Sequence, residues 1–292
     1  MAKAAQKRSS ASDSGPDDIW VEVMETLRSW GSAAIEILKG WGRAVVIATV
    51  AFFSIPFTLC GVTLPKLKKG EVSQAARALP VVGLAAGLIG GIVFTAAAFL
   101  GLPPLVAAIL AIAALIFLSG GGNEGEFARL ADVLVSGGSK TQKLAQLKEP
   151  AIGAYGICVL VLCLGLRVGI VTYIAHPAAV AGALGAAGAL SFAAVAVALY
   201  ALRPARRSGF AFQAGRVTAD QALVAVLLAV LLMILCLLDA ALIFGALVIG
   251  ALAAAKFAWF SKRDLGGTTK AVLGGVQQGT EIGVLLAIAA LI

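Results

Sequence analysis

The sequence LSGGGNEGEFARLADVLVSGGSKTQKLAQLKEPAIGAYG, residues 118–156, is the longest polar interval between two long apolar runs of this chain. It carries the acidic residues Glu124, Glu126, Asp132 and Glu149. The apolar runs on either side are long and nearly uncharged, as membrane-spanning helices are. Any phosphate, metal or proton chemistry must therefore find most of its polar groups in this interval.

The composition is that of a membrane protein. The 292 residues are 60% hydrophobic and 13% charged, whereas soluble domains carry roughly 25% charged residues. Several runs reach the roughly 20 apolar residues that a bilayer-spanning helix needs. These runs are continuous, and a β-barrel would show short alternating segments instead. We predict an all-α, polytopic integral membrane protein with about seven or eight spans, in contact with membrane lipids.

The net charge of +8 has its origin in the loops. Basic residues gather in every second loop, at 66–77, 118–156, 203–216 and 262–270, while the turns between carry almost none. Loops rich in Lys and Arg stay on the cytoplasmic side of a membrane. We therefore expect these loops to face the cytoplasm, and we expect no nucleic-acid partner.

Three regions of the chain differ in composition. Residues 1–18 have no apolar stretch to bury, which predicts a disordered tail. Residues 19–41 are amphipathic and rich in tryptophan, which favours either a helix at the headgroup level or a soluble helix docked on the rest. Residues 42–292 are the predicted membrane domain. Pro56 breaks its first apolar segment, 44–62, so a kinked span and a re-entrant segment both stay open.

The later apolar runs have three features that bear on packing. The run from Val81 is rich in glycine, which permits close helix packing. Arg167 lies inside an apolar run, and since an arginine is costly in lipid, it should face a polar interior or reach the headgroups. The run 222–260 is too long for one span, so we place a turn at Asp239. After the first segment, the expected spans are 81–101, 105–117, 151–174, 178–202, the two halves of 222–260 and a last segment ending at 292.

Motifs at the membrane boundaries identify a family. They are, in chain order, ARALPVVGLAAGLIGG (76–91), SGG (119–121), KLAQLKEPAIGAYG (143–156), RPARRSGF (203–210) and LGGTTKAVLGGVQQGTE (265–281). In sequence and order they resemble cobalamin synthase, the adenosylcobinamide-GDP ribazoletransferase family of polytopic membrane enzymes. The similarity runs from about Ala44 to the C-terminus.

The resemblance implies a late step of cobalamin biosynthesis in the bacterial inner membrane. A hydroxyl of α-ribazole, or of its phosphate, attacks the phosphate that links cobinamide to GMP, and GMP leaves. The substrates are thus a corrinoid and a nucleotide-type compound. The family requires Mg²⁺, which acidic loop residues are thought to hold against the pyrophosphate, in keeping with the preference of Mg²⁺ for one or two carboxylates plus phosphate oxygens.

This sequence departs from the family at its acidic motifs. Where the family reads approximately H-x-D-G-L-x-D-x-x-D, Asn123 replaces the histidine, and Gly125 and Arg129 replace the first two aspartates. Asp132 keeps its aspartate, and Glu149 keeps a negative charge in the stretch KEP. The aspartate of the C-terminal motif is also lost, since the sequence there reads Thr-Thr-Lys-Ala. Glycines and apolar residues survive while charged residues are lost.

The residues that could carry the chemistry follow from the motifs that remain. The predicted catalytic residues are Asp132 and Glu149. The predicted metal ligands are Asp132, Glu124, Glu126 and Glu281. The predicted phosphate-binding residues are Lys148, Arg203, Arg206 and Arg207. The alternative is that the two glutamates of the interval are solvated loop charges and that the basic residues only mark the cytoplasmic side.

Two hypotheses about function stay open. The first is an active transferase that joins adenosylcobinamide-GDP and α-ribazole. The second is a catalytically degenerate member, a pseudoenzyme, that binds a corrinoid, a nucleotide or a partner subunit without turnover. The homology favours the first and the lost acidic residues favour the second, and self-association is compatible with both. A transporter is the weakest alternative, because Arg167 is nearly the only charge inside a predicted helix.

Overall fold

The computed structural model describes residues 16–53, 61 and 67–292. Every regular element in that part of the chain is a helix, which confirms the predicted all-α class. The chain divides into two compact units, residues 1–43 and 44–292.

Helix α1 (Pro16–Phe52) contains the described part of the first unit. It begins inside the predicted tail, at a proline whose fixed φ suits the first helical position. It runs unbroken past residue 41, where we expected the membrane domain to begin. Trp30 and Leu38 are each 69% exposed, and the location of this helix at a membrane surface stays a prediction. Residues 1–15, and Pro56 with its neighbours, lie outside the described residues.

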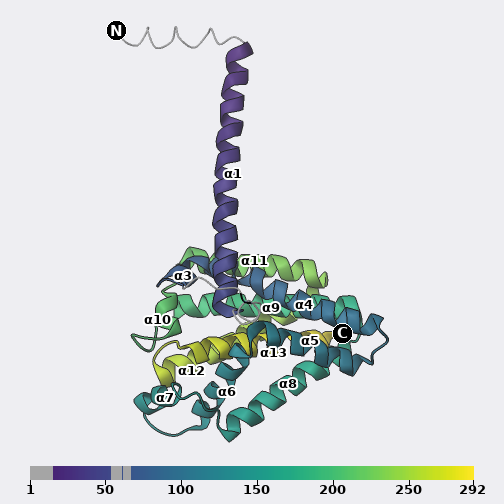
Figure 1. Cartoon of the computed structure of the whole chain (residues 1–292), viewed down its shortest axis with the longest axis vertical. Coiled ribbons are helices and arrows are strands. Elements are labelled where there is room, and N and C mark those ends of the chain that lie inside the picture. The colour runs from purple at the N-terminus through teal and green to yellow at the C-terminus, as the bar shows by residue number, and fades with distance from the viewer. Residues whose placement is uncertain (1–15, 54–60, 62–66) are drawn as a thin grey trace. The chain divides into compact units, whose positions relative to one another are not determined.

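The second unit is a bundle of long helices joined by short helical loops (Figure 1). Its elements are α3 (Glu71–Ala75), η1 (Ala76–Ala78), α4 (Leu79–Phe99), α5 (Pro104–Ser119), α6 (Gly122–Val135), α7 (Lys140–Gln146), α8 (Ala154–Ile174), α9 (Pro177–Ala201), α10 (Phe210–Ala214), α11 (Ala219–Leu237), α12 (Ala240–Phe260), η2 (Ser261–Leu265) and α13 (Lys270–Leu291).

The described helices confirm a polytopic membrane protein. Six of them are long and apolar enough to cross a membrane, or seven candidates if α5 and α6 form one bent span. The expected number of about seven or eight spans agrees with the upper of these figures. Helix α5 alone has only 16 residues, which rise roughly 24 Å and fall short of a roughly 30 Å hydrocarbon core. The first expected span also lies partly outside the described residues.

The turn predicted at Asp239 is confirmed. Helix α11 ends at Leu237, and α12 begins at Ala240 with Asp239 as its N-cap. The Asp239 carboxylate accepts hydrogen bonds from the backbone N–H groups of Ala241 and Leu242 at 2.9 and 3.0 Å. This aspartate is thus satisfied by the helix that it starts.

Helices α9 and α13 form the buried centre of the unit. In Figure 1, α11 lies above α9, and α6 and α8 lie below α13, while α4 packs along α9. Glycines bring α4 against α9: Gly83, Gly87 and Gly91 recur at every fourth residue and face the α9 backbone. A Cβ at Gly87 would overlap the Leu184 carbonyl and lie 2.8 Å from the Cα of Gly185. The close packing predicted for this glycine-rich run is confirmed.

A glycine turn separates α5 from α6. Gly120 and Gly121 have φ values of 64° and 67°, in the left-handed region that glycine adopts without steric cost. The two helices meet there at an angle of 88°. The bend carries α6 across α13 and α8, and it places Glu124 and Glu126 against the bundle instead of in an extended loop.

Candidate functional site

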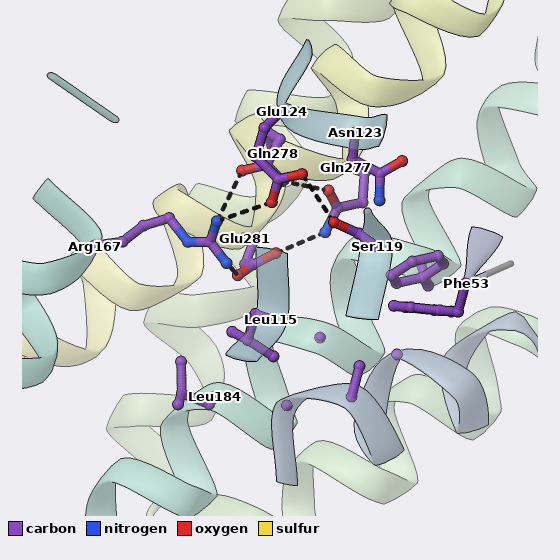
Figure 2. A pocket seen from close by; sticks show the side chains of 15 residues that line it. Phe53, Leu115, Ser119, Asn123, Glu124, Arg167, Leu184, Gln277, Gln278 and Glu281 are labelled. Atoms are coloured by element: carbon purple, nitrogen blue, oxygen red, sulfur yellow. Dashed lines mark hydrogen bonds and ion pairs between the residues drawn. The ribbon is translucent and has the colours of Figure 1, made fainter. Parts of the chain in front are cut away.

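A buried polar cluster lies where α5, α6, α8 and α13 meet. Arg167 of α8 is 1% exposed. Its guanidinium donates to Glu281 of α13 at 2.5 Å, to Glu124 of α6 at 3.4 Å and to the Gln278 side-chain oxygen at 3.3 Å. Figure 2 shows these side chains converging on the guanidinium. Of the two locations that the sequence left open for Arg167, a polar interior or the headgroups, the structure shows the polar interior.

Neighbouring amides and hydroxyls complete the cluster. The Gln278 amide donates to Glu124 at 3.2 Å and the Gln277 amide donates to Glu281 at 2.6 Å. The Ser119 hydroxyl donates to the other oxygen of Glu124 at 3.0 Å. The sequence analysis did not identify the glutamines, although two adjacent amides inside an apolar helix are themselves a signal of an internal partner.

The cavity beside this cluster is small. Its volume is about 30 Å³, and its polar lining includes Ser119, Asn123, Glu124, Arg167 and Gln277. A water molecule needs at least roughly 10–15 Å³ measured in this way. The cavity can therefore hold a water-sized group but not a nucleotide or a corrinoid.

A second polar pocket opens among the loops at the other side of α6. Its volume is about 140 Å³. Three of the stretches that resemble the family, 143–156, 203–210 and 265–281, contribute to its lining together with Glu126 of α6. The lining includes Glu126, Leu147, Arg206, Ser208, Thr268, Thr269 and Lys270. Segments far apart in the sequence are thus brought to one place. We call this cavity the loop pocket.

Backbone contacts hold the walls of the loop pocket together. A parallel bridge joins Pro204 to Thr268. The Thr268 N–H donates to the Arg203 carbonyl at 2.8 Å, and the Ala205 N–H donates to the Thr268 carbonyl at 2.9 Å. A Cβ at Gly267 would overlap the Arg203 carbonyl, so glycine is needed for this approach. The arrangement fixes the RPARRSGF loop against the start of α13.

The loop pocket is electropositive. Arg206 and Lys270 line it, and Glu126 is the acidic residue among its lining. Glu126 already accepts from Arg129 at 2.7 Å and lies 3.8 Å from the Lys270 ammonium. Together Arg206, Lys270, Arg129 and Glu126 carry a formal net charge of +2, and arginine forks match phosphate oxygens well. Lys270 was predicted only as one of the basic residues of the 262–270 loop, but the structure places it in the lining of the pocket.

The other predicted phosphate-binding residues lie elsewhere. Lys148, Arg203 and Arg207 are exposed, and they are not among the residues that line the loop pocket. Arg206 is half-buried and also donates to the Leu144 carbonyl at 3.4 Å. Of the four predicted residues, the structure brings Arg206 into the pocket.

Asp132 caps a helix. Its two carboxylate oxygens accept hydrogen bonds from the N–H groups of Gly153 and Gly156, each at 2.7 Å, at the start of α8. A Cβ at Gly156 would overlap this carboxylate, so the aspartate and the glycine fit each other. With Glu149 and Arg129, Asp132 also lines a cavity of about 230 Å³. The two predicted catalytic residues therefore share one cavity, but Glu149 is exposed.

We expect Asp132→Ala to lower the free energy of unfolding by about 1–2 kcal/mol, because two N–H groups and the positive end of α8 lose their partner. Thermal melting of the purified protein, with Mg²⁺ and with chelator, measures this loss. Glu149→Ala is the control, and its melting temperature should match the wild type. A loss for Asp132→Ala that occurs only with Mg²⁺ present would instead identify a metal ligand.

The four predicted metal ligands do not fit one Mg²⁺ site. Glu124 and Glu281 lie on Arg167, Glu126 lies on Arg129, and Asp132 lies at the start of α8. No three His, Cys, Asp or Glu residues in the described part of the chain group so as to hold a metal ion. Magnesium itself stays a prediction from the resemblance.

Comparisons with known proteins agree with the motifs. A family model described as cobalamin-5-phosphate synthase matches residues 43–289. The chain is 35% identical over 221 residues to an adenosylcobinamide-GDP ribazoletransferase of Bradyrhizobium diazoefficiens, covering 76% of this chain and 85% of the relative. It is 36% identical over 250 residues to the protein of the same name from Azorhizobium caulinodans, covering 84% and 95%. No solved structure matches the chain.

Proposed function

The chain belongs to the cobalamin-5-phosphate synthase family, and we propose that it joins adenosylcobinamide-GDP to α-ribazole, or to α-ribazole phosphate, with release of GMP. This reaction is a late step of cobalamin biosynthesis. We assign the reaction to the loop pocket, because stretches that bear the family resemblance meet there around Arg206 and Lys270.

The chemistry is one displacement at phosphorus. A hydroxyl oxygen of α-ribazole forms a bond to the phosphorus on the cobinamide side of the pyrophosphate. The bond from that phosphorus to the bridging oxygen breaks, and GMP leaves with the bridging oxygen. The hydroxyl proton passes to solvent or to a nearby base. Catalysis of such a step is mostly positioning and neutralisation of negative charge.

The loop pocket suits the phosphates of the substrate. Arg206 and Lys270 would neutralise the pyrophosphate oxygens. Three residues with hydroxyl groups, Ser208, Thr268 and Thr269, belong to the same lining. Pockets for drug-sized ligands have roughly 300–1,000 Å³, so a cavity of about 140 Å³ takes the pyrophosphate alone. The corrin ring and the guanosine would then lie outside it, along the loop face.

The same proposal places the loop pocket on the cytoplasmic side of a bacterial inner membrane. The loops that line it are rich in Lys and Arg, which favours the cytoplasmic face. The relatives named above come from bacteria. Protease accessibility of the 203–209 loop in sealed inverted vesicles tests this orientation.

A turnover assay tests the activity. The purified protein in liposomes receives adenosylcobinamide-GDP, α-ribazole phosphate and Mg²⁺, and GMP and the corrinoid product are followed together. Equal amounts of both products, absent from empty liposomes, are expected. If neither product forms while a working family enzyme turns over in parallel, the proposal fails. Substrate binding without turnover would then establish the non-catalytic hypothesis.

A further inference from the structure

We propose that Arg167 is the cation of the buried polar cluster: it pairs with both Glu124 and Glu281 where a metal ion would otherwise lie, so these two carboxylates bind no divalent cation. The proposal concerns metal binding and folding and does not depend on turnover. It departs from the Mg²⁺ role that the resemblance implies for acidic residues of this chain.

The hydrogen bonds around the two carboxylates carry the proposal. Glu281 accepts from Arg167 on one oxygen and from the Gln277 amide on the other. Glu124 accepts from Arg167 and Gln278 on one oxygen and from the Ser119 hydroxyl on the other. Every partner is a donor, which is the surrounding that an ionised carboxylate needs.

A divalent cation would have to displace the arginine. Mg²⁺ demands about six oxygen ligands in a near-octahedral arrangement at roughly 2.0–2.1 Å and usually keeps several waters. The adjacent cavity of about 30 Å³ leaves room for one water-sized group. The guanidinium already lies between the two carboxylates, with its nitrogens 2.5 Å and 3.4 Å from their oxygens. The positions that a metal ion would need for both carboxylates are therefore taken.

This pairing explains why Arg167 is tolerated inside the apolar helix α8. Helix α8 exposes apolar side chains such as Val161 and Leu162, at 62% and 71%, and so faces lipid over much of its surface. A cation within such a helix is expensive unless it is paired in the interior. Arg167 pairs with α6 and α13 and thereby fixes α8 to both. Two carboxylates against one guanidinium leave one negative charge in excess, and the neutral donors from α5 and α13 disperse it.

Isosteric variants separate an arginine counter-ion from a metal site. Glu124→Gln and Glu281→Gln each leave one carboxylate against Arg167, so the cluster becomes neutral and both proteins should fold. Arg167→Gln leaves two buried carboxylates without a cation, and Arg263→Gln, at an exposed ion pair on η2, is the matched control. Mn²⁺ binding, measured by electron paramagnetic resonance, and thermal melting are followed for all four and for the wild type.

The proposal predicts the same number of bound Mn²⁺ ions in wild type, Glu124→Gln and Glu281→Gln. It predicts a melting temperature roughly 10 °C lower for Arg167→Gln and nearly unchanged for Arg263→Gln, because breaking a buried ion pair is far costlier than breaking an exposed one. If Arg167→Gln folds, it should gain one Mn²⁺ ion. Loss of a bound Mn²⁺ ion in either glutamine variant would overturn the proposal, even if Arg167→Gln cannot be purified.

Discussion

Replacement of Gly87 by valine is expected to prevent the membrane unit from reaching its folded state. The α4 and α9 backbones touch at this residue, where an added Cβ would overlap the Leu184 carbonyl. No side-chain rotation relieves a collision with backbone, so the two helices must separate along their whole contact. We expect a loss of at least about 3 kcal/mol, a large part of the roughly 5–15 kcal/mol that stabilises a typical protein.

The control for this prediction is Gly165→Val on α8. Gly165 is exposed, and an added Cβ would meet nothing within 4 Å. Both variants carry the same side chain in an apolar helix, so membrane insertion should be similar. Size-exclusion chromatography of fluorescent fusions in mild detergent should give a single sharp peak for Gly165→Val and aggregate for Gly87→Val. The same single sharp peak for both variants would show that α4 and α9 do not pack in this way.

The second large effect is expected at the loop pocket. The double variant Arg206→Gln/Lys270→Gln removes both cations from the lining of this pocket and leaves the hydroxyl residues Ser208 and Thr268 in place. A hydrogen bond to a charged group contributes about 1.5–3 kcal/mol, so the loss of two should lower kcat/KM by about 10²- to 10⁴-fold. The loss should be found with saturating Mg²⁺ in the liposome assay.

The matched control is Arg203→Gln/Arg207→Gln, which removes the same amount of charge, here from the two neighbours of Arg206 in the 203–210 loop. Both residues are exposed and lie outside the pocket lining. We expect a loss of less than about 5-fold, through weaker long-range attraction alone. A similar loss in both double variants would mean that the charge of the whole loop, and not the pocket, recruits the substrate.

Much of the membrane architecture could be predicted from the sequence, because span length and interior charge are local properties. The turn at Asp239, the close packing of the glycine run from Val81 and, as one of two alternatives, the interior position of Arg167 all followed from single segments. Whether α5 counts as a span could not be predicted, because it turns at Gly120 and Gly121 and reaches the length of a span only together with α6.

The placement of the acidic residues could not be predicted in this way. Glu124 and Glu126 were both predicted as metal ligands offered by a loop, but the stretch is a helix, and residues at i and i+2 do not face each other. Glu124 therefore points to Arg167 in the core, while Glu126 lines the loop pocket. The contact between Glu124 and Gln278 joins residues separated by 154 positions, which no local pattern reveals.

The retained Asp132 and the substituted Arg129 of the family motif both make structural contacts in this chain. Asp132, which keeps the family's aspartate, accepts two backbone hydrogen bonds at the start of α8, so its structural task alone explains why the fold needs it. Arg129 replaces an aspartate and pairs with Glu126 at 2.7 Å. An ion pair between Arg129 and Glu126 thus stands where the family motif has an aspartate.

The most direct measurement is equilibrium binding of adenosylcobinamide-GDP to the protein in lipid nanodiscs, by titration calorimetry of the wild type and the two double variants. The account predicts saturable binding to the wild type and to Arg203→Gln/Arg207→Gln. It predicts at least about 100-fold weaker binding to Arg206→Gln/Lys270→Gln, since two charge-assisted contacts to phosphate are lost. Wild-type affinity in the Arg206→Gln/Lys270→Gln variant would contradict the assignment of the substrate phosphates to the loop pocket.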